Sequence, residues 1–290
     1  MSTLWQNIQS KMLRSGNRIN LLIGINVFIF LIVNIPAVFE KLFFQHDILS
    51  AYAQDYLQLP SYLPKLLTRF WTPITYMFMH AGIFHILFNM LWLYWMGQIF
   101  EEYLGDKRTI GLYLLGGLTG ALFFVLSYNA FPLFTNTDAV IGSTVVGASA
   151  SVMAIIIATA TLLPNYSISL MFIGSVKLKW IAVFYIIIDF LGVAGPNAGG
   201  EIAHLGGALF GFIYVKQLQR GHDWIGAISN IFKSRSKLKV VAKNSDKNSN
   251  SLPRQEEIDR ILDKISKSGY DSLSKQEKEV LFRASKDNEG

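Results

Sequence analysis

The sequence contains no cysteine and few charged residues. Without cysteine the chain can form neither a disulfide framework nor a thiolate zinc site, and its redox compartment stays undetermined. Charged residues make up 16% of the 290 residues and hydrophobic residues 51%, whereas a soluble domain is roughly a quarter charged. The composition therefore indicates a polytopic membrane protein.

A recognisable internal repeat is also missing. Many transporters are built from repeats that contain paired broken helices, so a small transporter is disfavoured. The net charge of +6 does not indicate a nucleic-acid partner, because the basic residues lie beside apolar segments and not on a patch with interleaved aromatic residues. We interpret these basic residues as determinants of membrane topology.

Six apolar segments are candidates for membrane-spanning helices, which need roughly 17–25 mostly apolar residues. The candidates are 19–39, 74–100, 109–128, 146–163, 179–195 and 201–217. In a six-span arrangement the flanking basic residues all lie on one side; they are Lys11, Arg14, Arg18, Lys107, Arg108, Lys177, Lys179, Lys216 and Arg220. The positive-inside rule makes this side cytoplasmic. We therefore expect an all-α multi-pass protein of the cell membrane, in a bacterial inner membrane, with both termini in the cytoplasm.

A cleaved signal peptide is the alternative interpretation of segment 19–39, because basic residues precede this segment. Its apolar run is long, however, and Ile35-Pro36-Ala37 is a poor cleavage site. Removal of the segment would also leave an odd number of spans. We therefore interpret it as a span.

The composition changes after the last span. Residues 1–18 are predicted to be a cytoplasmic segment and 19–217 the membrane domain, followed by a basic, Ser/Asn-rich linker at 218–252 and a small cytoplasmic helical tail at 253–290. In the tail, apolar residues recur at helical spacing, at Ile258, Ile261, Leu262 and Ile265.

The tail also carries a helix-start signal. Gly269 is expected to end one short helix, and Ser274 and Glu277 have the spacing of a capping box that begins a second. Docking of these amphipathic helices on a cytoplasmic partner, docking on the membrane, and a purely solvated role all stay open.

Polar residues inside the apolar segments are the strongest functional signal. An ionisable side chain in a bilayer costs roughly 2.5–3.5 kcal/mol on insertion scales, so the few that persist usually face the bundle interior. Such residues are His80, His85 and Asn89 in the second span, Ser149 in the fourth and His204 in the sixth. His85 and Asn89 are four apart and share one helix face. Asp189, in the fifth span, is interpreted as a buried polar residue or an anchor at the cytoplasmic end.

Small residues form stripes on two of these spans. One stripe is Gly207 and Gly211, on the face of His204, and the other is Ala150, Ala154 and Ala158, each four apart. Because small residues let transmembrane backbones approach closely, we expect the stripes to face each other and to bring Ser149 toward His204. Each feature alone is more often helix packing than catalysis. Together they suggest a serine nucleophile activated by an imidazole.

Three blocks of sequence carry a family resemblance. They are HAGIFHILFNMLWLYWMGQIFEEYLG (80–105), GASAS (147–151) and AHLGGALFG (203–211). In order and spacing they resemble the blocks of the rhomboid family of intramembrane serine proteases, bacterial type, over about residues 20–217. The resemblance implies a six-helix bundle that uses neither a metal nor another cofactor.

The resemblance also implies roles for individual residues. Ser149 would be the nucleophile and His204 the general base and then acid, in a dyad without an acidic third member. Three groups would form the oxyanion hole: His85, Asn89 and the backbone N–H of Ser149. His80 would help to order a water-filled cavity near the active site, and Gly147 would border the oxyanion site. The cavity would open outward under a roof formed by the loop 40–73 and neighbouring segments.

The implied partners are the lipid bilayer and single-span membrane proteins, which would be cleaved in or near their transmembrane helix. The implied activity is that of a serine-type endopeptidase, a hydrolase for intramembrane proteolysis. A catalytically silent rhomboid-like protein that binds membrane clients is the alternative.

Two positions depart from the family pattern. Ala150 follows the nucleophile where the family commonly has glycine, and Met153 stands where an aromatic residue often stacks on the catalytic histidine. Alanine is still small, and methionine can make a soft sulfur–ring contact, so we expect activity to be retained. Two neighbouring serines are not candidates: Ser151 is interpreted as a packing or back-bonding residue and Ser143 as part of the preceding loop.

Overall fold

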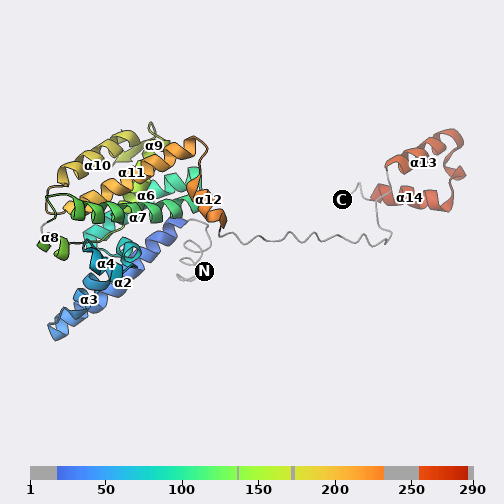
Figure 1. The fold of residues 1–290 in the computed structure, drawn as a ribbon. Coiled ribbons are helices and arrows are strands. Elements are labelled where there is room, and N and C mark those ends of the chain that lie inside the picture. Colours follow the sequence, from blue (N-terminus) through green and yellow to red (C-terminus); the bar gives the residue numbers. More distant parts are fainter. Residues whose placement is uncertain (1–17, 136, 171–173, 232–254, 287–290) are drawn as a thin grey trace. The chain divides into compact units, whose positions relative to one another are not determined.

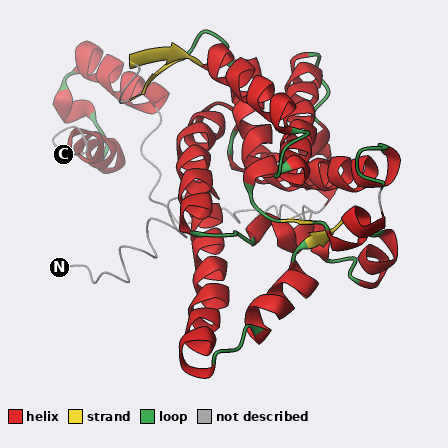
Figure 2. Ribbon diagram, turned by 90° about the vertical axis from the view of Figure 1, so that its left-hand side faces the viewer, coloured by secondary structure: helices red, strands yellow, loops and turns green. Residues whose placement is uncertain are grey.

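The computed structural model describes residues 18–135, 137–170, 174–231 and 255–286. The chain divides after Ser234 into two compact units. Helices dominate both units, and the strands of the described residues form two small antiparallel pairs, β1–β2 and β3–β4 (Figures 1 and 2).

Each predicted span of the first unit contains a helix. Within the described residues, four helices are long and apolar enough to cross a membrane: α2 (Arg18–Phe44), α6 (Ile83–Leu104), α7 (Asp106–Ala130) and α11 (Ala198–Gln219). Two shorter helices occupy the fourth and fifth candidates: α9 (Ser149–Leu162) and α10 (Leu178–Gly192). The connecting elements are α3 (Ile48–Leu57), β1 (Leu59–Pro60), α4 (Leu63–Thr68), α5 (Thr72–Thr75), the 3-10 helix η2 (Tyr76–Phe78), α8 (Thr137–Gly142), β2 (Thr144–Val145), β3 (Ser167–Leu170), β4 (Gly174–Lys177) and α12 (Trp224–Ile231). A polytopic helical membrane bundle is thus observed, while the total of six spans stays a prediction.

Helix α9 is the buried centre of this unit, packed against α6, α7, α10 and α11. It has 14 residues, and every position from Ala150 to Ala160 is buried. At about 1.5 Å per residue its length is about 21 Å, which is less than the roughly 30 Å of a bilayer's hydrocarbon core. If its far end reaches one membrane surface, Ser149 at its start lies inside the apolar layer.

The chain that leads into α9 is extended, and neighbouring segments satisfy its backbone. β1 pairs with β2, the N–H of Ser61 donates to the carbonyl of Ser143 at 3.1 Å, and the N–H of Gly147 donates to the carbonyl of Tyr76 at 2.9 Å. Non-helical backbone is tolerated at membrane depth only where protein or a water-filled cavity meets its hydrogen-bonding needs. These bonds therefore hold the entrance to α9 in place.

The second predicted span, 74–100, begins too early. The apolar residues before Ile83 form α5 and η2, after which the chain turns through extended backbone at Met79 (ψ 142°) and Gly82 (φ −179°). His80 therefore lies in the connection before α6 and not within a span. Hydrophobicity alone did not reveal this turn, because the residues on both sides of it are equally apolar.

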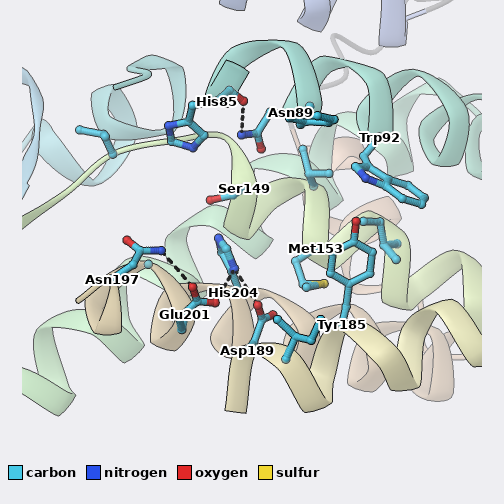
Figure 3. A pocket seen from close by; sticks show the side chains of 16 residues that line it. His85, Asn89, Trp92, Ser149, Met153, Tyr185, Asp189, Asn197, Glu201 and His204 are labelled. Atoms are coloured by element: carbon cyan, nitrogen blue, oxygen red, sulfur yellow. Dashed lines mark hydrogen bonds and ion pairs between the residues drawn. The ribbon is translucent and has the colours of Figure 1, made fainter. Parts of the chain in front are cut away.

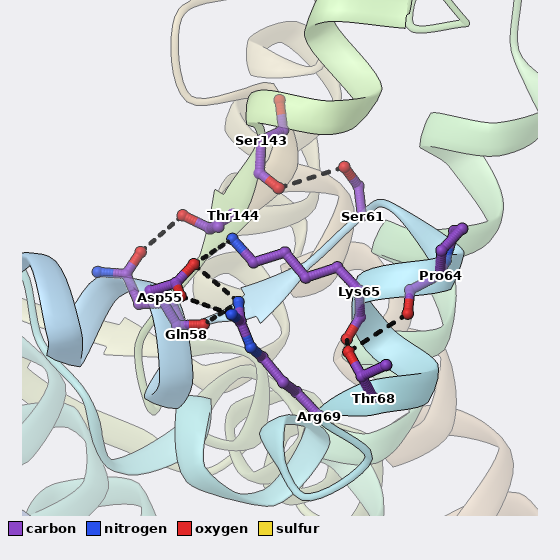
Figure 4. A network of polar contacts seen from close by, with 9 residues as sticks. All are labelled: Asp55, Gln58, Ser61, Pro64, Lys65, Thr68, Arg69, Ser143 and Thr144. Atoms are coloured by element: carbon purple, nitrogen blue, oxygen red, sulfur yellow. Dashed lines mark hydrogen bonds and ion pairs between the residues drawn. The ribbon is translucent and has the colours of Figure 1, made fainter.

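The loop 40–73 is held by a cluster of charged side chains (Figure 4). The guanidinium of Arg69 donates to both carboxylate oxygens of Asp55, at 2.7 and 2.5 Å, and lies 4.3 Å from the ring centre of Tyr56. The ammonium of Lys65 is 2.7 Å from the same carboxylate. Hydrogen bonds from Lys65 and Arg69 hold the pKa of Asp55 below its usual range. The cluster thereby fixes the loop that contributes β1.

Residues 218–231, predicted to be linker, instead contain the end of α11 and helix α12. Asp223 caps α12 by accepting from the N–H of Gly226 at 2.9 Å, and its carboxylate also accepts from the guanidinium of Arg108 at 2.8 and 3.0 Å. Burial raises the pKa of Asp223, but the bonds from Arg108 and Gly226 outweigh this and hold it below its usual range. Ile225 is buried against α7. The remaining predicted linker, 232–252, lies outside the described residues.

The second unit contains α13 (Gln255–Ser268), the 3-10 helix η3 (Tyr270–Ser272) and α14 (Lys275–Lys286). The predicted capping box is confirmed: Ser274 N–H donates to the Glu277 carboxylate at 2.7 Å, and Glu277 N–H donates to the Ser274 hydroxyl at 3.3 Å. The ammonium of Lys264 and the Ser274 bonds lower the pKa of Glu277 to about 2. Gly269 ends α13 with a positive φ of 79°, as the sequence predicts.

Candidate active site

A cavity of about 380 Å³, with a mainly apolar lining and several polar side chains, lies among four helices of the first unit. Its lining comes from α6, α9, α10, α11 and the chain just before α9 and α11: His85, Phe88, Asn89, Trp92, Val146, Ser149, Val152, Met153, Ile156, Tyr185, Ile188, Asp189, Asn197, Gly200, Glu201 and His204. The structure thus brings Ser149, His204, His85 and Asn89 together around one space (Figure 3). Among the lining residues none comes from 40–73, so the part of the prediction that places this loop over the cavity is wrong.

Ser149 is the first residue of α9. The preceding N-cap position is Ala148, which has no polar side chain to accept from the first N–H groups of the helix. The N–H groups of a first helical turn have no partner within their own helix and carry partial positive charge. The start of α9 is therefore suited to bind an oxygen that becomes negatively charged.

Gly147 leaves room between two polar atoms of the site. Its φ is +127°, a conformation that residues with a Cβ rarely adopt. A Cβ at this position would lie 2.8 Å from His85 Nε2 and 3.2 Å from Ser149 Oγ. Because both atoms border the same small space, glycine keeps this space open.

His85 points its Nε2 into this region. The backbone N–H of Ala81 donates to His85 Nδ1 at 3.3 Å, which makes Nδ1 the acceptor of a neutral ring and leaves the proton on Nε2. Asn89 lies one turn further along α6 and donates one amide hydrogen to the His85 carbonyl at 2.8 Å. Its second amide hydrogen is available, so the predicted shared helix face carries two N–H donors.

His204 faces Ser149 from α11. Figure 3 shows one ring nitrogen, Nε2, directed toward the Ser149 hydroxyl across the cavity. The other, Nδ1, lies 3.1 Å from Asp189 Oδ1 and 3.5 Å from Glu201 Oε2. Within the described part of the chain no direct hydrogen bond joins Ser149 to His204. Catalytic hydrogen bonds are often long without substrate and tighten in the complex.

The position of Asp189 agrees with the first of its two sequence-based interpretations, a buried polar residue. It is buried, with 3% of its surface exposed. Asp189 lies near the end of α10 remote from Lys177 and Lys179, which is the end where His204 is found. Together with Glu201 it places acidic groups on the histidine that was predicted to have none.

The sequence contained a signal for Glu201 as a neighbour of His204, but none for Asp189. Glu201 precedes His204 by three residues on the same helix, so both share one face, and Asn197 donates to Glu201 at 3.0 Å. In contrast, the approach of Asp189 to His204 depends on how α10 packs against α11. No pattern within either helix reveals it.

The predicted small-residue contact is confirmed. A Cβ at Gly207 would collide with the carbonyl oxygen of Ala150, and a Cβ at Gly211 with that of Ala154. The methyl groups of Ala150 and Ala154 lie elsewhere than expected, however. Both face α7, where a Cβ at Gly120 would lie 2.6 Å from the Ala150 methyl and a Cβ at Gly116 would collide with the Ala154 methyl. The residue that departs from the family pattern therefore leaves the contact between α9 and α11 unobstructed.

The remaining predicted residues surround the site. His80 is buried behind the cavity, with its ring centre 5.2 Å from that of His85. Met153 lines the cavity beside Tyr185 (Figure 3), and Ala158 is fully buried. Ser151 packs against α7, and its hydroxyl has no hydrogen-bond partner among the described residues, so packing and not back-bonding describes it.

The side chains of Asp189, Glu201 and His204 also have ligand atoms within 4.8 Å of one another, which is close enough to hold a metal ion. The expectation that the site uses no metal or cofactor stays a prediction.

The fold and the site define a polytopic helical membrane protein with a Ser/His cavity at the start of a short buried helix. Comparison with known proteins gives the family. The Rhomboid domain model matches residues 67–220, which is more than half of the chain, and the chain belongs to the rhomboid family.

A curated relative agrees with this assignment. RHOMBOID-like protein 12, mitochondrial, from Arabidopsis thaliana is 31% identical over 162 residues, which cover 53% of this chain and 48% of that protein. The chain thus spans about half of the length of this relative. A second family model, a family of unknown function (DUF6576), matches residues 244–287.

Proposed function

We propose that this protein is an intramembrane serine endopeptidase that cleaves membrane proteins within or near a transmembrane helix. One observation carries the proposal: the hydroxyl of Ser149, the imidazole of His204 and the N–H donors of His85 and Asn89 line one cavity. Acyl transfer needs a nucleophile, a base and oxyanion donors within a few ångströms of one reacting carbon.

The proposed reaction follows the placement of these groups. Ser149 Oγ attacks the scissile carbonyl carbon while its proton passes to His204 Nε2, and the carbonyl π electrons move onto the oxygen. The oxyanion is held by the Ser149 N–H, His85 Nε2–H and the Asn89 amide. The C–N bond then breaks, and the leaving nitrogen takes the proton from Nε2. Water, activated by the same nitrogen, finally releases the acyl group.

The proposed substrates are single-span membrane proteins whose helix unwinds locally. A helical backbone hides its carbonyl groups in hydrogen bonds, so the helix must open before a hydroxyl can reach a carbonyl carbon. We also propose six spans in a bacterial inner membrane with cytoplasmic termini, on the positive-inside pattern. The C-terminal helices α13 and α14 would then lie in the cytoplasm, available to a partner there.

A fluorophosphonate probe on the detergent-purified protein tests the proposal, since this reagent forms a covalent bond with an activated serine. We expect labelling that is lost in Ser149→Ala and His204→Ala. Labelling is expected to persist in Ser151→Ala and Ser143→Ala, which remove hydroxyl groups close in sequence. Labelling retained in Ser149→Ala would show that another residue reacts.

The alternative is a catalytically silent rhomboid-like protein that binds membrane clients. Membership of the family is compatible with this alternative as well, because the family assignment rests on sequence and not on activity. It predicts no labelling of the wild-type protein in an assay where an active serine hydrolase is labelled. It also predicts that membrane clients are bound without being cut.

A further inference from the structure

Two acidic side chains surround the ring nitrogen of His204 that does not face Ser149. Asp189 Oδ1 is 3.1 Å from Nδ1 and Glu201 Oε2 is 3.5 Å from it. These carboxylates come from different helices, α10 and α11 (Figure 3). A hydrogen bond at Nδ1 decides which tautomer an imidazole adopts and how its ring is oriented.

The surroundings of the two carboxylates differ. Asp189 has 3% of its surface exposed, and its second oxygen, Oδ2, has no hydrogen-bond partner among the described residues. Asn197 donates to Glu201 Oε1 at 3.0 Å. A Cβ at Gly192 would lie 2.9 Å from Glu201 Cγ, so the end of α10 closely confines this side chain.

A buried carboxylate is costly unless a charge or a donor compensates it. For Asp189 the compensating partner that the structure provides is His204. The same contact makes the His204 imidazole a better proton acceptor at its other nitrogen, because a nearby negative charge stabilises the resulting imidazolium. Burial strengthens this effect, since the local dielectric constant is low.

We infer that Asp189 and Glu201 are positioning residues for His204: they accept the Nδ1–H hydrogen bond and thereby keep Nε2 directed at Ser149 as the proton acceptor. This inference rests on the proposed endopeptidase function. During the reaction the proton of the Ser149 hydroxyl moves to Nε2 and later to the leaving nitrogen. Negative charge on this carboxylate pair stabilises the imidazolium that exists between these two transfers.

The closer and more deeply buried Asp189 contributes more than Glu201. Other polar and titratable groups around His204 are Ser149 on α9, His85 on α6, Tyr185 on α10 and Asn197 before α11. None of these groups carries a negative charge near neutral pH. The two carboxylates are therefore the groups whose removal changes the pH at which His204 becomes a competent base.

The test compares Asp189→Asn and Glu201→Gln with the wild-type protein. Two rates are measured at several pH values: the rate of fluorophosphonate labelling and the rate of cleavage of a single-span substrate. We expect Asp189→Asn to slow both by up to about 10⁴-fold, the loss seen when the acidic partner of a catalytic histidine is replaced by its amide in other serine hydrolases. A smaller loss is expected for Glu201→Gln. The acidic limb of the pH profile should move to lower pH in both variants, because an imidazole without its carboxylate loses its proton more readily.

Asp47→Asn is the matched control, since Asp47 pairs with Lys41 on the surface, outside the cavity, and should leave both rates unchanged. A purely structural role of Asp189 would lower the rate without moving the acidic limb, and that result would overturn the inference. If Asp189→Asn does not fold, as judged by thermal unfolding, the shift of the limb in Glu201→Gln decides the question.

Three further outcomes separate the hypotheses. Variants that react like the wild-type protein, with Ser149→Ala inactive, would overturn the positioning roles and leave the endopeptidase standing. A wild-type protein that neither labels nor cleaves, beside an active control enzyme, would overturn the proposed function itself. Loss of labelling in EDTA would also overturn the inference, because the three side chains would then be holding a metal ion.

Discussion

Replacement of Gly147 by alanine tests the geometry of the site with one methyl group. Gly147 has a φ of +127°, which an alanine adopts at a cost of about 1–3 kcal/mol. The new Cβ would lie 2.8 Å from His85 Nε2 and 3.2 Å from Ser149 Oγ. Both distances are shorter than ordinary contacts of carbon with nitrogen or oxygen, so one of the two side chains must move.

The expected magnitude follows from what occupies this space in the reaction. An oxyanion that accepts a hydrogen bond from His85 Nε2 must lie within about 3 Å of it, close to the position of the added methyl group. Loss of a single oxyanion donor reduces the rate of acyl transfer by about 10²- to 10³-fold, which corresponds to roughly 2.7–4 kcal/mol. We expect Gly147→Ala to lose at least this much in the labelling rate.

The assay measures the fluorophosphonate labelling rate and thermal unfolding of the same samples. Gly142→Ala is the matched control, because Gly142 precedes α9 by a few residues and a Cβ there meets no atom within 4 Å. We expect the control to label like the wild-type protein. Gly147→Ala that folds and labels within a few-fold of the wild-type rate would refute the argument that Gly147 keeps the oxyanion position open.

Other contacts predict further effects. Gly207→Val places a branched side chain against the carbonyl of Ala150. We expect this overpacking to lower the unfolding free energy by about 1–3 kcal/mol and thus to lower the unfolding temperature. An unchanged unfolding temperature would contradict the close contact of α9 with α11. Ala150→Gly removes a methyl that faces Gly120 and should keep labelling within a few-fold of wild type, whereas its abolition would show that the methyl positions the site. The pKa of Asp223 lies below its usual range, so its pairing with Arg108 stabilises the fold above about pH 4 and this contribution is lost as pH falls through the lowered pKa. Arg108→Ala should therefore lower the unfolding free energy at neutral pH by about 1 kcal/mol and much less in acid; an equal loss at both pH values would contradict the pairing.

Several features of the fold followed from local patterns. Long apolar runs predicted helices in all six places, since a chain in a bilayer must satisfy its backbone hydrogen bonds within itself. The capping box at Ser274 and Glu277 was predicted from spacing alone, because capping is a contact between residues three apart. The turn before Ile83 was missed, because its apolar residues give no contrast in hydrophobicity.

The residue types of the candidate site could be predicted from the sequence, because the motifs specify them. The serine, the histidines and the asparagine carry their chemistry in their side chains, and small residues at helical spacing predicted the close contact of α9 with α11. The orientation of the Ala150 methyl was not predictable, because both α7 and α11 pack against α9 at this position.

The sequence by itself determined the membrane class of the protein, its family and the side chains available for chemistry, because these depend on composition, local order and spacing. Only the tertiary structure decided which groups meet. Asp189 and His204 lie on different helices, and their 3.1 Å contact depends on the rotation and depth at which α10 packs against α11. A hydrogen bond across two helices has no counterpart in either helix alone, so the acidic partner of His204 became visible only after folding.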